Sequence, residues 1–286
     1  AIGAANPDTD IWEFWKNKKE LKTALPVGTV LTISAAGSEM SNSAVLTDEE
    51  TQDKSGIGSD LIRPKFAIMN PELTYTIPKY QLTCGIVDIF MHTIERYFTP
   101  VHGNELTDEI AEGLMRTLIR NAAKAYENQE DYDAMSEIMW CGSISHNGIT
   151  GLGRPKDFLC HKLGHQLSAK FDEAHGATLS AVWGSWARYV YHLDEARFAN
   201  YGRKVWNIDE KNDEKTAVAA IERTEEFFRS LHMPTCLGDM KMGVQPDEVL
   251  KEMAGKATAG DTVKVGAFQK MGEKELYEIY KKANHR

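Results

Sequence analysis

Residues 84–95 read CGIVDIFMHTIE and form the centre of an apolar helical pattern. Ile77-Pro78 marks the beginning of this helix, and Phe98-Thr99-Pro100 marks its end. Asp88 and His92 lie four residues apart inside the pattern, so they share one helix face. An unpaired carboxylate in a core is costly, so the pair predicts either a buried Asp–His hydrogen bond or part of a metal site. Apolar residues recur around them at helical spacing: Leu82, Ile86, Ile89, Phe90 and Ile94.

A second polar cluster follows in residues 161–175, HKLGHQLSAKFDEAH, which hold three of the nine histidines of the chain. His161 and His165 share a helix face. Asp172-Glu173 indicates a break and a new helix that begins near His175, which can bring His175 back towards His161.

One metal ion would satisfy Asp88, His92 and two of the three later histidines. A carboxylate with several imidazoles and no thiolate suits Fe²⁺, Zn²⁺, Ni²⁺ or Co²⁺. Two other metal motifs fail on the residues. A zinc protease needs Glu after the first His of HExxH, but that position is Lys162. A ferritin-like site needs paired Glu and ExxH repeats, which HTIE and DEAH do not supply.

The whole chain divides into a short β-containing region, residues 1–76, and a helical region, residues 77–286. We expect strands at 28–34, 43–47 and 65–69, separated by turn-rich segments such as DEETQDKSGIGSD. After the first helix, we expect further helices at 105–127, 131–149, 156–170, 174–192, 195–206, 213–231, 246–255 and 273–284. We assign core packing to the thiol of Cys160 and to four aromatic residues, Trp140, Phe158, Trp183 and Trp186.

Composition excludes several classes of protein. The net charge of −9 and the lack of a basic run argue against a nucleic-acid partner. No apolar run reaches the length of a membrane span, so we expect no membrane partner. Four scattered cysteines without a CxxC pair fit a reducing compartment, and we predict a cytoplasmic protein.

The sequence resembles the iron-dependent alcohol dehydrogenase family, in its NADH- or NADPH-dependent butanol dehydrogenase and aldehyde reductase branch. The resemblance runs from Ala1 to about Ala283. It rests on GIVDIFMHTIERY, DFLCHKLGHQLSAKFDEAHGATLSAV, VLTISAAGSEMSNSAVLTDEETQDK, FAIMNPELTYTIP and HNGITGLGRPKDF. It implies an α/β parent fold, of which this chain holds a short remnant of the dinucleotide-binding domain and an all-α, dehydroquinate-synthase-like metal domain.

The resemblance also implies roles for individual residues. Asp88, His92, His161 and His175 correspond to metal ligands, with Fe²⁺ as the expected ion and Zn²⁺ or Ni²⁺ as alternatives. His165 corresponds to a catalytic, non-ligand histidine near the nicotinamide and the substrate. Contacts to NADP(H) or NAD(H) are implied for Thr32, Ser34, Ser41, Lys54 and Tyr75.

The implied reaction is hydride transfer between the dinucleotide and a primary alcohol or aldehyde such as butanol or butanal, in an expected homodimer. The chain departs from the family pattern because it lacks a GGGS-type pyrophosphate loop, so we expect a fragment that binds metal but does not turn over alcohols alone. Ala36 also stands where many members have Thr. Two alternatives stay open: a glycerol-dehydrogenase-like polyol dehydrogenase, and a non-catalytic helical metal-binding domain.

Overall fold

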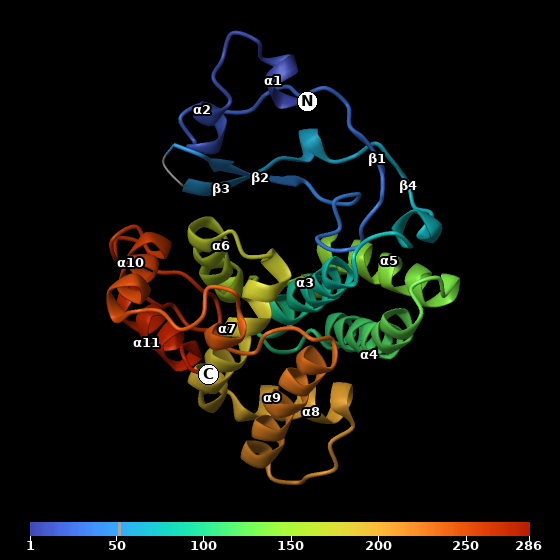
Figure 1. Ribbon diagram of the computed structural model, residues 1–286, viewed down its shortest axis with the longest axis vertical. Helices are drawn as coiled ribbons and strands as arrows, with labels where there is room; N and C mark the ends of the chain where they lie inside the picture. Colours follow the sequence, from blue (N-terminus) through green and yellow to red (C-terminus); the bar gives the residue numbers. More distant parts are fainter. Residues whose placement is uncertain (51–52) are drawn as a thin grey trace.

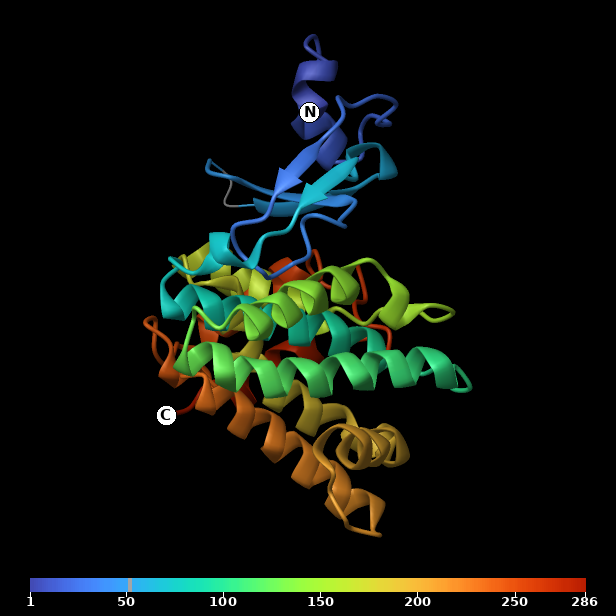
Figure 2. The same cartoon turned by 90° about the vertical axis from the view of Figure 1, so that its right-hand side faces the viewer.

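The computed structural model describes residues 1–50 and 53–286, with the side chains of residues 53 and 54 left aside. A small β-containing part stands above a larger helical body (Figures 1 and 2). The small part contains α1 (Ile2–Ala5), α2 (Trp12–Trp15), β1 (Gly28–Val30), β2 (Ser43–Asp48), β3 (Asp53–Gly58) and β4 (Phe66–Ile68). The helical body contains α3 (Lys79–Tyr97), α4 (Glu105–Glu127), α5 (Tyr132–His146), α6 (Leu159–Phe171), α7 (His175–Val190), α8 (Glu195–Trp206), α9 (Asp213–Ser230), α10 (Asp247–Ala257) and α11 (Glu273–Ala283).

The strands of the small part form two separate pairs. β1 lies parallel to β4, with Gly28 opposite Phe66, and β2 lies antiparallel to β3, with Ser43 opposite Gly58. The turn assigned to residues 53–58 was wrong, because these residues form β3. Their composition is poor in β-formers, and the strand exists because the β2 backbone supplies its hydrogen-bond partners.

The helical body is built around α3. Every residue from Leu82 to Tyr97 is buried, and α4, α5 and α7 pack against this helix. The nine predicted helices are confirmed within a few residues at their ends. Core packing is also confirmed for Cys160, Trp183 and Trp186, but it was wrong for Trp140, whose side chain is exposed on α5.

A second, smaller apolar cluster lies in the β-containing part, at Ile2, Phe14 and Trp15. The two parts meet where the loop after β1 reaches α3 and α5. Gly85 of α3 has no Cβ, and one added there would lie 2.1 Å from the carbonyl oxygen of Ser34. The Ser143 hydroxyl of α5 donates a hydrogen bond to Glu39 in the same loop region. The absence of a side chain at Gly85 therefore sets how closely the small part sits on the helical body.

The junction predicts opposite effects for two helical glycines. Gly85→Ala should destabilise the protein by about 1–3 kcal/mol, because the loop must move away from α3. Gly113→Ala on α4 is the matched control, since the nearest atom to its added Cβ is Arg116 Nη2 at 3.9 Å. That change should stabilise the helix by roughly 0.5–1 kcal/mol. Urea unfolding of both variants checks the pair, and equal stability of Gly85→Ala and the parent protein would contradict the close approach.

Candidate metal centre and its cleft

The five predicted metal and catalytic residues come from three helices of the body. Asp88 and His92 lie on α3, His161 and His165 on α6, and His175 is the first residue of α7. Between α6 and α7 the chain turns sharply at Asp172, which ends α6 with a left-handed backbone at φ 54°. This turn brings His175 back towards His161, as expected, so that their ring centroids lie 5.3 Å apart.

Three imidazoles converge on one carboxylate oxygen. Asp88 Oδ1 lies 3.5 Å from Nε2 of His92, 3.6 Å from Nε2 of His161 and 3.7 Å from Nε2 of His175. The Nε2 atoms of His92 and His161 are 3.4 Å apart. Asp88, His92 and His161 are buried, whereas the side chain of His175 is 30% exposed. The cluster is therefore closed on the protein side and open on the side of His175.

The donor set fits a divalent cation. Asp88 Oδ1 is buried without a hydrogen-bond partner among the described residues, and the surrounding nitrogens lie too far away for good hydrogen bonds. Burial opposes ionisation of Asp88, but His161 and the other histidines outweigh it and lower the carboxyl pKa. Burial, together with His161, puts the pKa of His92 well below its usual value, so this imidazole is neutral. An ionised carboxylate and neutral imidazole lone pairs are the donors that Fe²⁺ and Zn²⁺ accept.

Glu95 holds the far side of His161. Its fully buried carboxylate contacts His161 Nδ1 through one oxygen and accepts the backbone N–H of Cys160 through the other, at 2.7 Å. Burial would lower the pKa of His161, but Glu95 outweighs it and raises that pKa to about 9. A carboxylate on Nδ1 keeps the proton there, and a cation bound at Nε2 would displace the second proton of the ring. Sequence analysis missed Glu95, although it stands three residues after His92.

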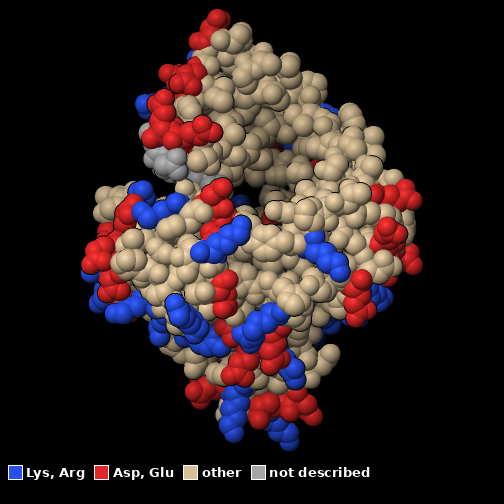
Figure 3. All heavy atoms as spheres, in the orientation of Figure 1, with Lys and Arg blue, Asp and Glu red and all other residues tan. Residues whose placement is uncertain are grey.

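A cleft of about 1320 Å³ opens above this cluster, between the β-containing part and the helical body. Figure 3 shows the hollow between the two parts. His92, His161 and His175 form part of its wall, and His165 lines it as well. The ring of His165 lies 5.2 Å from that of His175 but outside the buried trio. His146 on α5 also lines the cleft, and burial lowers the pKa of this imidazole to about 4.

Four of the five predicted dinucleotide contacts, Thr32, Ser34, Ser41 and Tyr75, are not among the residues that line this cleft. Thr32 is exposed, Ser34 and Ser41 are buried, and Tyr75 packs against the helical core. Lys54 pairs through its backbone with Thr47, and its side chain lies outside the described part of the chain. The same region instead lines the cleft with Ala36, Asn42 and Ser43. Dinucleotide contact by the five predicted residues therefore stays a prediction.

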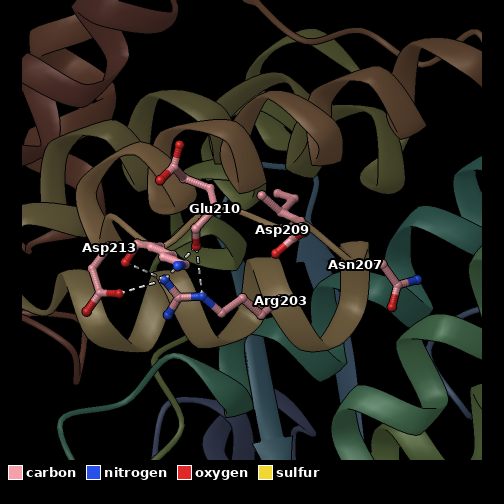
Figure 4. A pocket seen from close by; sticks show the side chains of 7 residues that line it. Arg203, Asn207, Asp209, Glu210 and Asp213 are labelled. Carbon is pink, nitrogen blue, oxygen red and sulfur yellow. Dashed lines mark hydrogen bonds and ion pairs between the residues drawn. The ribbon is translucent and has the colours of Figure 1, made fainter.

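A different hollow lies at the loop between α8 and α9 (Figure 4). Its one Arg, Arg203, donates to the carbonyl oxygen of Glu210 at 2.9 Å and to Asp213 at 2.8 Å. These bonds tie the loop to α8, so the charge of Arg203 serves the fold. Within residues 1–50 and 53–286, the Asp88, His92 and His161 group is the one whose ligand atoms lie close enough to share a metal.

Family comparisons agree with this geometry. The model of the Fe-containing alcohol dehydrogenase family, C-terminal, matches residues 83–284, and that of iron-containing alcohol dehydrogenase matches residues 1–71. The chain belongs to the iron-containing alcohol dehydrogenase family. The resemblance found in the sequence is thus confirmed, and the protein is an oxidoreductase of the alcohol dehydrogenase and aldehyde reductase type.

Several members of the family are similar to this protein over most of its length. NADH-dependent butanol dehydrogenase A of Clostridium acetobutylicum is 36% identical over 278 residues, which cover 96% of this chain and 71% of that protein. NADPH-dependent aldehyde reductase YqhD of Escherichia coli is 39% identical over 221 residues, 77% of this chain and 57% of that protein. The crystal structure of NADH-dependent butanol dehydrogenase A from Thermotoga maritima superposes with a TM-score of 0.93 at 31% identity, and the match covers 99% of this chain and 72% of that one.

The fold of the family member agrees with the coarse expectation of a small sheet region and a large helical region. The finer likeness to dehydroquinate synthase, the domain boundary at residue 76 and the homodimer stay predictions. None of the described helices is long and apolar enough to cross a membrane.

The contact between Glu95 and His161 predicts a loss of metal affinity in Glu95→Gln. We expect the dissociation constant for Zn²⁺ or Co²⁺ to rise by about 10–100-fold, because an amide no longer fixes the proton on Nδ1. Glu112→Gln is the matched control, since Glu112 is a buried carboxylate that accepts from Tyr97 at 2.8 Å and touches no histidine in the described structure. Titration followed by the Co²⁺ absorption spectrum measures both variants, and equal affinities would show that Glu95 does not tune His161.

Proposed function

We propose that the protein transfers hydride between NADP(H) or NAD(H) and a primary alcohol or aldehyde, with butanol and butanal as representative substrates. A divalent cation, Fe²⁺ in this proposal, is held by Asp88, His92, His161 and His175. The observation that carries the proposal is the convergence of three Nε2 atoms on one buried carboxylate oxygen at the floor of a large cleft. The relatives, named as NADH-dependent butanol dehydrogenases and an NADPH-dependent aldehyde reductase, support the choice of reaction.

When bound, the divalent ion supplies a Lewis acid for the substrate oxygen. The surrounding residues of the chain set the conditions for that chemistry. Asp88 and His92 lie in the buried stretch of α3, so water reaches the cluster from the side of His175 and the cleft. Phe158 covers His161 with its ring at a centroid distance of 4.7 Å, which makes this part of the wall apolar. A bound reduced nicotinamide would supply the hydride for the carbonyl carbon, and the carbonyl oxygen would gain a proton, which balances aldehyde reduction.

His165 is proposed to move that proton. It lies one helical turn after His161, lines the cleft and is partly exposed, so solvent can exchange with it. Its ring neighbours His175, the proposed ligand at the open side of the cluster, at 5.2 Å. An imidazole is a common general acid or base and can give or take a proton. The arrangement separates one histidine for proton movement from three for metal binding.

The ligand assignment predicts loss of metal in His161→Ala and His175→Ala. Each change removes one of the convergent nitrogens, so the purified variants should hold far less iron or zinc than the parent protein. His102→Ala is the control, because His102 pairs with Asp194 on the surface at 3.1 Å. Elemental analysis after dialysis gives the metal content, and full occupancy in both ligand variants would reject the site.

The proton-transfer assignment predicts a different result for His165→Ala. In the natural gene product that contains this sequence, the variant should keep its metal while butanal reduction with NADPH or NADH slows by about a hundred- to ten-thousand-fold. Metal content and turnover are measured on the same preparation. Loss of metal together with activity would make His165 a ligand. An absence of aldehyde reduction by the metal-loaded parent with either dinucleotide would reject the function and favour a non-catalytic metal domain.

A further inference from the structure

The cleft has a cationic lining in an acidic protein. Its described lining residues include no Asp or Glu, although the whole chain carries a net charge of −9. Asp88 lies beneath this surface and is not part of the lining. The cations that line the cleft are Arg63, Arg96, Arg154, Lys156 and Lys162. Such a surface attracts an anion and concentrates it near the metal cluster.

Two of these charges are already neutralised. Arg63 pairs with Asp60 at 2.9 Å, and Arg154 pairs with Asp108. Arg96, Lys156 and Lys162 have no ion pair with a carboxylate among the described residues. The last three are therefore the positive charges that an entering ligand meets.

Arg96 is the costly member of this set because it is buried. Arg96 is 5% exposed, and its guanidinium donates a hydrogen bond to the backbone oxygen of His92 at 2.5 Å. The stem is confined as well, since a Cβ on Gly151 would lie 3.1 Å from three of its carbons. The carboxylates of Glu95 and Asp88 attract this charge but form no ion pair with it within the described residues, so part of its desolvation cost is left uncompensated. An anion that binds beside it would recover some of that free energy.

Phe158 joins Arg96 and Lys156 into one unit. The Arg96 guanidinium lies 4.8 Å from the Phe158 ring centroid, and the Lys156 ammonium lies 5.0 Å from it. The same ring lies 5.5 Å from the imidazole of His92. The Phe158 ring therefore contacts both cations and one imidazole of the metal cluster, and Arg96 Nη1 itself lies 3.3 Å from Nδ1 of His92.

The position of this ring is well determined by its surroundings. Phe158 has a left-handed backbone at φ 52°, which is unusual for a bulky residue. The preceding Asp157 anchors it, because one Asp157 oxygen accepts the backbone N–H of Phe268 at 2.8 Å and also that of Ala267. The two cations thus flank a fixed ring at a fixed position relative to His92 and His161.

We propose that Arg96 and Lys156 form a subsite for a carboxylate at the far end of the substrate, so that the preferred aldehyde is a short-chain oxo acid. The inference rests on the proposed function and names its substrate class. The planar guanidinium can bind both carboxylate oxygens, and the ammonium adds a second charged donor. The aldehyde end then faces His175 and His165. Hydride adds to the aldehyde carbon and a proton to its oxygen, which gives the hydroxy acid and the oxidised dinucleotide.

The test compares 4-oxobutanoate with butanal, which have the same number of carbons but end in a carboxylate and a methyl group, respectively. The metal-loaded natural gene product is assayed with NADPH and with NADH. We expect the parent protein to prefer 4-oxobutanoate in kcat/KM. In Lys156→Gln, this preference should fall about tenfold, mainly through KM for the oxo acid, because a charge-assisted hydrogen bond is lost.

Lys162→Gln is the matched control. It removes the same charge from the same cleft, but Lys162 does not stack on Phe158 in the described contacts. The preference should stay unchanged in this variant. An equal fall in both Lys variants would show a general electrostatic field and no local subsite, which overturns the proposal.

A binding measurement separates the subsite from turnover. Calorimetric titration of the metal-loaded protein with 4-hydroxybutanoate and with 1-butanol should show tighter binding of the hydroxy acid. In Lys156→Gln, the ratio of the two dissociation constants should shrink about tenfold. Equal use of both aldehydes by the parent protein overturns the inference. A second outcome also overturns it: Lys156→Gln raises KM for the dinucleotide and slows the reduction of both aldehydes equally. Lys156 would then bind a dinucleotide phosphate. If neither aldehyde is reduced, the proposed function fails, and the titration alone decides whether the carboxylate subsite exists.

Discussion

A carboxylate buried inside an apolar helix is the constraint on which this structure depends. Asp88 lies in a stretch of α3 where every residue from Leu82 to Tyr97 is buried. Its charge has to be compensated by nearby groups, because burial of an isolated carboxylate is strongly unfavourable. The compensation comes chiefly from His161 on α6 and His175 on α7. The arrangement of three helices is thus tied to the electrostatics of one oxygen atom.

Close backbone contacts make this arrangement precise. Gly176, the second residue of α7, approaches α3 so closely that a Cβ would lie 2.1 Å from the carbonyl oxygen of Cys84. On the neighbouring part of α3, Gly85 allows the same closeness to Ser34 of the β-containing part. α3 therefore carries two of the proposed metal ligands, Asp88 and His92, and also contacts both α7 and the β-containing part above the cleft. The metal cluster and the cleft share their geometry because they share α3.

Charged side chains have different partners outside the cleft and inside it. Away from the cleft, several cations pair with carboxylates, as Arg197 does with Asp108 at 2.5 Å, which connects α8 to α4. Inside the cleft, carboxylates are lacking among the described lining residues, and the two cations beside Phe158 form no direct ion pair with a carboxylate of the described chain. Buried pairs stabilise a fold through complementary geometry, whereas an uncompensated cation beside an open cavity interacts with whatever enters it. The same residue types thus serve the fold in one place and ligand binding in another.

The sequence by itself determined the helices, the family and the candidate metal residues. These depend on local order along the chain: a period of 3.6 residues, proline and glycine at helix ends, and Asp88 and His92 at a spacing that puts them on one face. The strand at residues 53–58 was beyond this reasoning, because its pairing with β2 provides what its composition lacks. The exposed position of Trp140 was also unpredictable from a helical pattern that is apolar on several sides.

The tertiary structure alone decided which residues meet across the site. Glu95 touches His161 although the two are 66 residues apart, and no spacing rule links them. The packing of the helices also brings Phe158, Arg96 and Lys156 together. On the other side of the cleft, Ala36, Asn42 and Ser43 line the wall, while Ser34 and Ser41 are buried. Local patterns record the environment of each residue within its own helix or strand. The neighbours of a side chain across a cleft follow from how several helices pack, and that information is spread over the whole chain.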